Sequence, residues 1–203
     1  MTDSIQPIPP SHAPALAVVL ARAGSKGLPN KNGVTIAGKP MLAWTLEHAL
    51  NSQLIDRVIL STDGPALAEV GRQMVGVDVV LRPAELANDT ATVDAAARHA
   101  VNQLVSMHEH IVILYGNVPV RPADLTDRAL QKLTDTSCDS VQSVYPVEKN
   151  HPYWMKTVEG GSDRLNMLIE NNIYRRQDLP PVHMLDGGVI ALTRQALFTI
   201  KNG

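Results

Sequence analysis

The chain has 203 residues, 44% of them hydrophobic, which is enough for one domain with a substantial core. Eighteen lysines and arginines against twenty aspartates and glutamates leave a formal net charge of -2, which argues against a nucleic-acid partner because such proteins carry a basic face. The single cysteine, Cys138, cannot form an internal disulfide and fits a reducing, cytoplasmic compartment.

Residues 1–14 carry four prolines and no lysine or arginine, so they lack the positive start of a secretory signal. We expect them to form a disordered tail ahead of one domain over 15–203. The longest apolar run, 15–21, is far shorter than the roughly twenty residues that span a bilayer, so no membrane contact is expected.

From Ala15 onward, short apolar runs alternate with amphipathic stretches, a pattern typical of parallel strands joined by crossover helices. The apolar runs predict strands over 15–20, 57–60, 77–81, 111–115, 140–144 and 187–192. The amphipathic stretches predict helices over 65–74, over 90–107 with Asp89 as a candidate N-cap, over 122–133, and from Pro40 and Thr193 onward. Leu42, Leu46, Ala49 and Leu50 should share the buried face of the helix after Pro40. The sequence therefore predicts an α/β fold.

The alternation breaks down between residues 146 and 181, which we interpret as an excursion from the sheet. Tyr153, Trp154 and Tyr174 lie in this segment outside the sheet pattern. Because exposed aromatic side chains are enriched at protein interfaces, the excursion is predicted to carry a homodimer contact.

A basic, glycine-containing loop, A-R-A-G-S-K-G-L-P-N-K-N over 21–32, follows the first predicted strand. Gly24 and Gly27 allow a positive φ and a close approach of backbone N–H groups to a ligand. Cations and a hydroxyl donor accompany them, namely Arg22, Lys26, Lys31 and Ser25. The spacing matches neither a P-loop nor a dinucleotide fingerprint. The loop predicts a polyphosphate site, with a solvated turn as the alternative.

Ligands of open α/β sheets bind at the carboxyl ends of the strands, so the residues that follow each strand are site candidates. Arg82 follows the third predicted strand and is a candidate nucleotide contact, with a solvated surface arginine as the alternative. Asp63 follows the second strand and is expected to form a turn or cap a helix. The segment 115–121 follows the fourth strand.

Four segments together resemble the acylneuraminate cytidylyltransferases, which make CMP-sialic acid, and the related CMP-Kdo synthetases. Besides the loop at 21–32, they are S-T-D-G at 61–64, V-V-L-R-P-A-E-L-A-N-D-T-A at 79–91 and R-R-Q-D-L-P-P at 175–181. The resemblance implies a three-layer, mostly parallel nucleotidyltransferase fold of Rossmann-like type, in which the excursion forms the contact of a homodimer.

The same resemblance implies an Mg²⁺-dependent transfer of CMP from CTP to the anomeric hydroxyl of a nonulosonate, with release of pyrophosphate. Arg22 and Lys31 would stabilise the leaving pyrophosphate as the catalytic cations. The other residues implied to contact CTP are Gly24, Ser25, Asn32 and Arg82. The sugar would contact Tyr115, Asn117, Arg176, Gln177 and Asp186, with Arg176 on its carboxylate. No residue stands out as a general base.

Two departures from the family pattern concern the metal. Asn117, in Y-G-N-V-P-V-R over 115–121, stands where CMP-Kdo synthetases carry a metal-binding aspartate, and a neutral amide is a weaker Mg²⁺ ligand. The family's downstream carboxylate pair has no counterpart before Gly203, which predicts either a truncated chain or an incomplete metal site, and the metal ligands stay unassigned. The alternatives are a cytidylyltransferase for another sugar acid such as Kdo, and a catalytically impaired nucleotide-binding homologue.

Overall fold

The computed structural model describes residues 13–24, 27–28, 30–88, 90–104 and 108–199. The chain divides into two compact units, unit 1 over 1–142 and 187–203, and unit 2 over 143–186. Most of the predicted tail, the predicted phosphate contact Ser25 and the candidate cap Asp89 lie outside the described residues. Within the described chain, no helix has the length and apolarity needed to cross a membrane.

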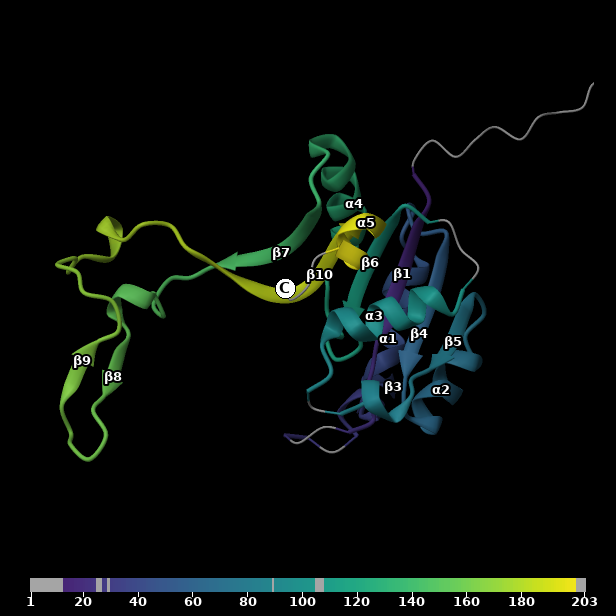
Figure 1. The fold of residues 1–203 in the computed structure, drawn as a ribbon, viewed down its shortest axis with the longest axis horizontal. Coiled ribbons are helices and arrows are strands. Elements are labelled where there is room, and N and C mark those ends of the chain that lie inside the picture. The colour runs from purple at the N-terminus through teal and green to yellow at the C-terminus, as the bar shows by residue number, and fades with distance from the viewer. Residues whose placement is uncertain (1–12, 25–26, 29, 89, 105–107, 200–203) are drawn as a thin grey trace, which may run out of the picture. The chain divides into compact units, whose positions relative to one another are not determined.

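A six-stranded sheet forms the centre of unit 1, in the order β5-β4-β1-β6-β10-β7 (Figure 1). The strands are β1 (Ala15–Leu20), β4 (Arg57–Thr62), β5 (Val77–Leu81), β6 (His110–Tyr115), β7 (Ser140–Pro146) and β10 (His183–Thr193). Strand β1 pairs in parallel with β4 and β6, β4 pairs in parallel with β5, and β10 runs antiparallel to β6. The predicted α/β fold with a mostly parallel sheet is confirmed.

Helices cover both faces of this sheet because the side chains of β1 alternate between two apolar cores. Ala15, Ala17 and Val19 pack in one core with side chains of α1 (Met41–Leu50), α2 (Pro65–Arg72) and α4 (Leu125–Thr136). Leu16, Val18 and Leu20 pack in the other with α3 (Val93–Asn102) and α5 (Arg194–Thr199). A strand buried on both faces reads as a continuous apolar run, which is why the sequence located β1 so clearly.

Several predicted helix boundaries are wrong, for local reasons. Helix α3 starts at Val93 because the Thr92 hydroxyl caps it, accepting the Ala95 N–H at 3.2 Å. Helix α4 starts at Leu125 rather than at Pro122, because residues 122–125 first form a turn in which the Leu125 N–H donates to the Pro122 carbonyl at 3.1 Å. Leu50, expected on the buried face of α1, is 37% exposed.

A small antiparallel hairpin, β2 (Thr35–Ile36) with β3 (Lys39–Pro40), separates the first loop from α1. Its turn residues Ala37 and Gly38 both have positive φ, 48° and 87°, as a two-residue type I′ hairpin turn requires. The hairpin thus ends the connection to α1 that begins with the predicted phosphate loop.

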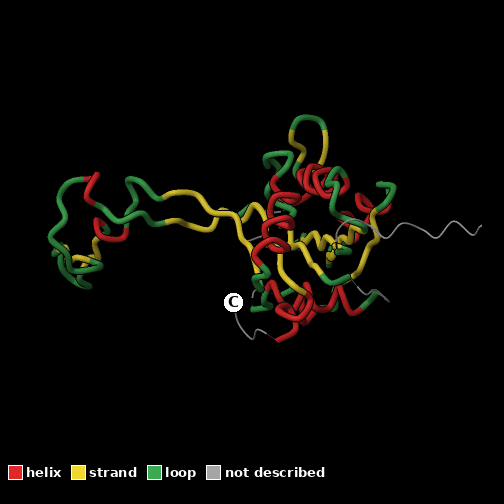
Figure 2. The backbone as a smooth tube through the Cα atoms, turned by 90° about the horizontal axis from the view of Figure 1, so that it is seen from above, coloured by secondary structure: helices red, strands yellow, loops and turns green. Residues whose placement is uncertain are grey.

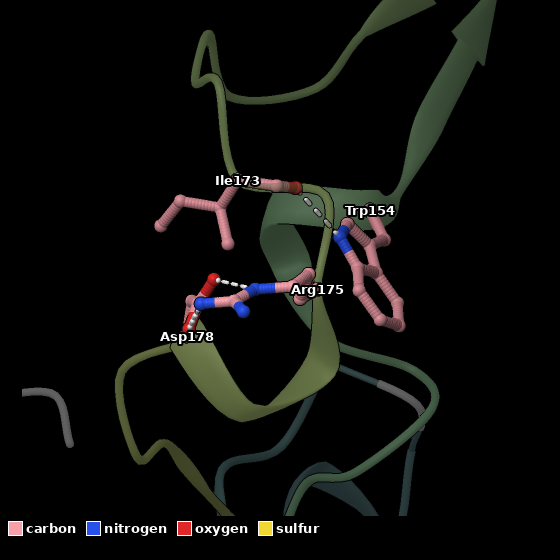
Figure 3. A network of polar contacts seen from close by, with 4 residues as sticks. All are labelled: Trp154, Ile173, Arg175 and Asp178. Carbon is pink, nitrogen blue, oxygen red and sulfur yellow. Dashed lines mark hydrogen bonds and ion pairs between the residues drawn. The ribbon is translucent and has the colours of Figure 1, made fainter.

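Unit 2 consists mostly of loops, with one short hairpin of β8 (Lys156–Val158) and β9 (Leu165–Met167) (Figure 2). His151, 1% exposed, holds the loops together: its Nε2 lies 3.0 Å from the Pro180 carbonyl, and its Nδ1 accepts the Tyr153 N–H at 3.1 Å. Figure 3 shows the Trp154 Nε1–H donating to the Ile173 carbonyl at 3.1 Å. The segment predicted as an excursion lies within this unit.

Candidate active site

A pocket of about 320 Å³ opens in unit 1 at the carboxyl ends of the parallel strands. Its walls come from the loop after β1, the residue after β5, the turn after β6 and the first turn of α3. The residues lining it include many that the sequence singled out, namely Arg22, Gly24, Lys31, Asn32, Arg82, Tyr115 and Asn117. The fold therefore brings together side chains that are far apart in the sequence.

Strand β4 holds the loop after β1 in place through hydrogen bonds. The Ala21 N–H donates to the Ser61 carbonyl at 3.1 Å, and the Ala23 N–H donates to Asp63 Oδ1 at 2.8 Å. Asp63 was expected to form a turn or cap a helix, yet no side chain caps α2. Its carboxylate instead fixes the backbone of the phosphate loop.

The glycines of this loop do not behave as the sequence suggested. Neither Gly24 nor Gly27 has a positive φ, and the residue in the left-handed region is Asn30, with φ 51° and ψ 33°. A Cβ at Gly24 would meet no atom within 4 Å. The close approach occurs at Gly116 in the turn after β6, where an added Cβ would lie 2.9 Å from Ala21 Cβ.

Arg82 is half-buried and hydrogen-bonded rather than a solvated surface side chain. Its Nε donates to Ser61 Oγ at 2.8 Å, and its Nη2 donates to the Ser61 carbonyl at 2.7 Å. Burial lowers the pKa of the Arg82 guanidinium, while Asp63 acts to raise it and Arg22 to lower it. An arginine remains protonated under such shifts, so two guanidinium groups are held near each other at the pocket.

The charged side chains that line the pocket favour an anionic ligand. Arg22, Lys31 and Arg82 line it, and no aspartate or glutamate is among the described residues of its wall. Walls of one charge sign concentrate a ligand of the opposite sign. The arrangement suits a phosphate chain.

One side-chain atom of Asn32 is buried without a hydrogen-bond partner among the described residues. The side chain is 7% exposed, and its Nδ2 donates to the Arg22 carbonyl at 2.8 Å. Its Oδ1 is buried and accepts no hydrogen bond from any residue that the structure describes. Leaving a buried acceptor unpaired costs about 1–3 kcal/mol, so Asn32 is a locally unfavourable feature of the pocket wall.

The turn after β6 supplies two further side chains. Tyr115 is half-buried, and burial together with the charge of Asp94 raises the pKa of its phenol, so the hydroxyl is protonated at neutral pH and can donate. Asn117 is exposed at the pocket wall. Both groups are neutral, in contrast to the cations of the first loop.

The described residues do not fit a magnesium site built by the protein. They contain no group of three or more histidines, cysteines, aspartates or glutamates that could hold a metal ion. The side-chain amide oxygens at the pocket, from Asn32, Asn88 and Asn117, are weaker ligands for a hard cation than carboxylates.

Three of the predicted sugar contacts belong to unit 2, whereas all described residues that line the pocket belong to unit 1. Arg176 Nη2 lies 2.6 Å from Glu148 Oε2, in a pair whose side chains are 54% and 62% exposed. Gln177 is exposed beside it. Asp186 accepts a hydrogen bond from the Ser143 hydroxyl.

A family model described as cytidylyltransferase matches residues 16–179. The chain belongs to the cytidylyltransferase family. The resemblance inferred from its four motifs is thereby confirmed, and the matched range contains the whole first loop, Arg82 and the turn after β6.

Curated relatives of this cytidylyltransferase-family chain carry related names. The N-acylneuraminate cytidylyltransferase of Streptococcus agalactiae is 30% identical over 189 residues, which are 92% of this chain and 45% of that protein. The CMP-N,N'-diacetyllegionaminic acid synthase of Legionella pneumophila is 29% identical over 196 residues, 92% of this chain and 81% of that protein. The chain thus spans about half the length of the first relative.

A solved structure of CMP:2-keto-3-deoxy-manno-octonic acid synthetase complexed with CTP has the same fold. It superposes with a TM-score of 0.70 at 20% sequence identity, covering 91% of this chain and 76% of that one. The likeness supports the α/β fold described above.

Gly116 of this cytidylyltransferase-family chain is a site residue that sequence reasoning did not single out, and it yields a test. An alanine there would press its Cβ on Ala21 Cβ at 2.9 Å and Asn32 Oδ1 at 3.2 Å. We expect Gly116→Ala to lower the free energy of unfolding by about 1–3 kcal/mol in urea titrations, the usual cost of overpacking. The matched control is Gly24→Ala, which adds its Cβ in open space and should change stability by less than about 0.5 kcal/mol. Equal stability of the two variants would contradict the close approach.

Proposed function

We propose that the chain transfers CMP from CTP to the anomeric hydroxyl of a nonulosonate, a nine-carbon 2-keto sugar acid, and releases pyrophosphate. The observation that carries the proposal is the pocket at which Arg22, Lys31 and Arg82 converge. Membership of the cytidylyltransferase family supports CTP as the donor. The names of the curated relatives, which refer to acylneuraminate and diacetyllegionaminic acid, support a nonulosonate as the acceptor.

The cations of the first loop would bind the triphosphate. Attack on the α-phosphate needs an in-line approach and neutralisation of the charge that moves to the leaving pyrophosphate, rather than a covalent intermediate. Arg22 and Lys31 supply that charge, and Asp63 keeps their loop in place through the Ala23 N–H. Gly24 and Ser25 would contact the phosphates by their backbone and hydroxyl donors.

The nucleoside would lie between Arg82 and Asn32. Arg82 is already fixed by Ser61, so its guanidinium binds without losing much side-chain freedom. Asn32 lines the same pocket as Arg82 and is proposed as the second contact of the nucleoside.

Tyr115 and Asn117, which line the pocket of unit 1, are proposed to contact the sugar acid. In unit 2, taken by itself, the residues proposed to contact a sugar acid are Arg176, Gln177 and Asp186, with Arg176 on the carboxylate. An arginine can hold a carboxylate in a bidentate fork that lysine cannot copy. The exposed pair of Arg176 with Glu148 is worth about 0–1 kcal/mol, so a substrate carboxylate can replace Glu148 at little cost.

Magnesium is proposed to arrive with the nucleotide, as part of the Mg·CTP substrate. When protein carboxylates are few, Mg²⁺ binds mainly to phosphate oxygens and water. The residues of this chain would then bind and orient the complex through its phosphates.

A cytoplasmic location is part of the proposal, since CTP is a cytoplasmic metabolite and Cys138 is a free thiol.

A pyrophosphate-release assay tests the proposal. It would offer the protein CTP, Mg²⁺ and a panel of nine-carbon and eight-carbon sugar acids, with UTP and ATP as control donors. Release with CTP and a nonulosonate supports the proposal. Release with Kdo alone would favour another sugar acid, and CTP binding without release would favour an impaired homologue.

Arg22 and Lys31 are the side chains that the proposal assigns to the CTP donor. We expect Arg22→Ala and Lys31→Ala each to weaken CTP binding by about 1.5–3 kcal/mol, the worth of a charge-assisted hydrogen bond. Isothermal titration calorimetry measures the loss. Lys132→Ala, which removes an exposed cation of α4, is the control and should leave the affinity unchanged. Unchanged affinity in both loop variants would refute the loop assignment.

The second prediction concerns Asn117 and the metal. If this side chain lies near the Mg²⁺ of bound Mg·CTP, Asn117→Asp adds a hard anionic ligand and should lower the Mg²⁺ concentration needed for half-maximal pyrophosphate release. If Asn117 hydrogen-bonds ribose or sugar instead, the carboxylate repels the triphosphate and weakens CTP binding at every Mg²⁺ concentration. Asn102→Asp, an exposed site on α3 outside the pocket wall, controls for the charge change itself.

The third prediction concerns assembly. Unit 2 exposes several large apolar side chains, namely Val144, Tyr145, Val158, Leu165, Leu168, Ile169, Tyr174, Met184 and Leu185. Aromatic side chains and methionine are enriched at protein interfaces, and unit 2 exposes Tyr145, Tyr174 and Met184 among these residues, so we propose that two copies of unit 2 form a homodimer. Light scattering at micromolar concentration should give twice the monomer mass of 22.0 kDa. Tyr174→Ser, at a side chain that is 90% exposed, should shift the mass toward the monomer, and a wild-type monomer would contradict the proposal.

A further inference from the structure

Arg121 forms hydrogen bonds with three elements of unit 1. Its Nη2 donates to the Tyr115 carbonyl at 3.0 Å, and its Nη1 donates to the Val118 carbonyl and to Thr45 Oγ1, the latter at 3.0 Å. Its Nε donates to the Gly188 carbonyl at 2.6 Å. One guanidinium thus joins the turn after β6 to α1 and to β10.

Thr45 completes this arrangement from α1. The side chain is fully buried, and its Oγ1 lies 3.3 Å from the Tyr115 carbonyl and 3.1 Å from the Val118 carbonyl. Both carbonyls of the turn therefore face the same hydroxyl and the same guanidinium. Buried carbonyls without such partners would be costly, so the network fixes the conformation of the turn.

The opposite side of the turn is fixed by close packing. The Gly116 N–H donates to the Leu20 carbonyl at 2.9 Å, and Gly116 leaves no room for a Cβ against Ala21. An added Cβ at Gly187, whose φ is 70°, would lie 3.3 Å from the Tyr115 ring. The turn is thus held between the first loop on one side and the Arg121 network on the other.

We propose that Arg121 is a positioning residue for the acceptor end of the pocket, acting through the turn that carries Tyr115 and Asn117. This inference rests on the proposed function. Arg121 is not among the residues that line the pocket, whereas Tyr115 and Asn117 are. The cations assigned to CTP sit on other segments, so loss of Arg121 should affect the acceptor and leave the donor nearly untouched.

Lysine cannot replace arginine in this role. The guanidinium presents five N–H donors in a rigid plane, and it uses them on acceptors from three elements. An ammonium group on a flexible stem can reach one or two of these acceptors and loses the hydrogen bonds to the others. Arg121→Lys keeps the charge and tests the geometry alone.

The experiment compares Arg121→Lys, Arg121→Ala and Thr45→Val with wild type. Arg128→Ala serves as the control, because Arg128 is an arginine of α4 whose side chain is 61% exposed. Amide hydrogen exchange of residues 116–118 is measured in the free protein, alongside calorimetric CTP affinity, urea unfolding, and kcat and KM for the acceptor. Thr45→Val removes the same network from the other side, which keeps the test valid if an Arg121 variant folds poorly.

In Arg121→Lys we expect exchange at 116–118 to rise about tenfold or more and kcat/KM for the acceptor to fall about tenfold or more, the effect of one lost hydrogen bond to a charged group. CTP affinity should stay within about twofold, since the cations that bind it do not move. Added guanidinium ions should partly restore acceptor turnover in Arg121→Ala, but not in Arg22→Ala.

Parallel losses of CTP affinity, acceptor turnover and global stability would overturn the proposal, because they indicate a structural role only. Unchanged exchange at 116–118 in both Arg121 variants would overturn it as well. A wild-type protein that binds CTP and turns over no sugar acid contradicts the proposed function, and the exchange rates then still decide whether Arg121 holds the turn.

Discussion

The site depends on the parallel pairing of β1 with its two neighbours. Leu20, the last residue of β1, pairs with Ser61 of β4 and with Tyr115 of β6. The pairing continues past the strand, since the Ala21 N–H donates to Ser61 and the Gly116 N–H donates to Leu20. The first loop is therefore fixed between the ends of β4 and β6, and the pocket forms where these segments meet.

The pocket holds like charges close together, which lowers the stability of the folded protein. Burial lowers the pKa of Arg82 and the nearby charge of Arg22 lowers it further, while Asn32 keeps a buried oxygen without a partner in the described structure. Under the proposed function, a bound anion would offset the repulsion between the two guanidinium groups. Fixed donors and charges of this kind need little reorganisation when charge develops in a transition state, which is how an enzyme lowers a barrier electrostatically.

The sequence predicted the strands and the first loop because both depend on local pattern. A doubly buried strand is a continuous apolar run, and a basic loop after it has a distinctive composition. It could not predict that Asp63 holds Ala23, that Gly116 rather than Gly24 makes the close approach, or that Arg121 braces the turn after β6. Each of these contacts joins residues whose proximity follows from strand order and register, which a single sequence does not contain.

Hydrogen exchange measured with and without Mg·CTP tests the central claim most directly. The claim is that the loop after β1, the residue after β5 and the turn after β6 bind one nucleotide. We expect CTP to slow exchange in peptides covering 20–24, 31–33, 80–84 and 115–118, and to leave the hairpin of β8 and β9 unchanged. UTP and ATP should protect the same peptides less. Protection confined to unit 2, or no protection at saturating CTP, would contradict the account.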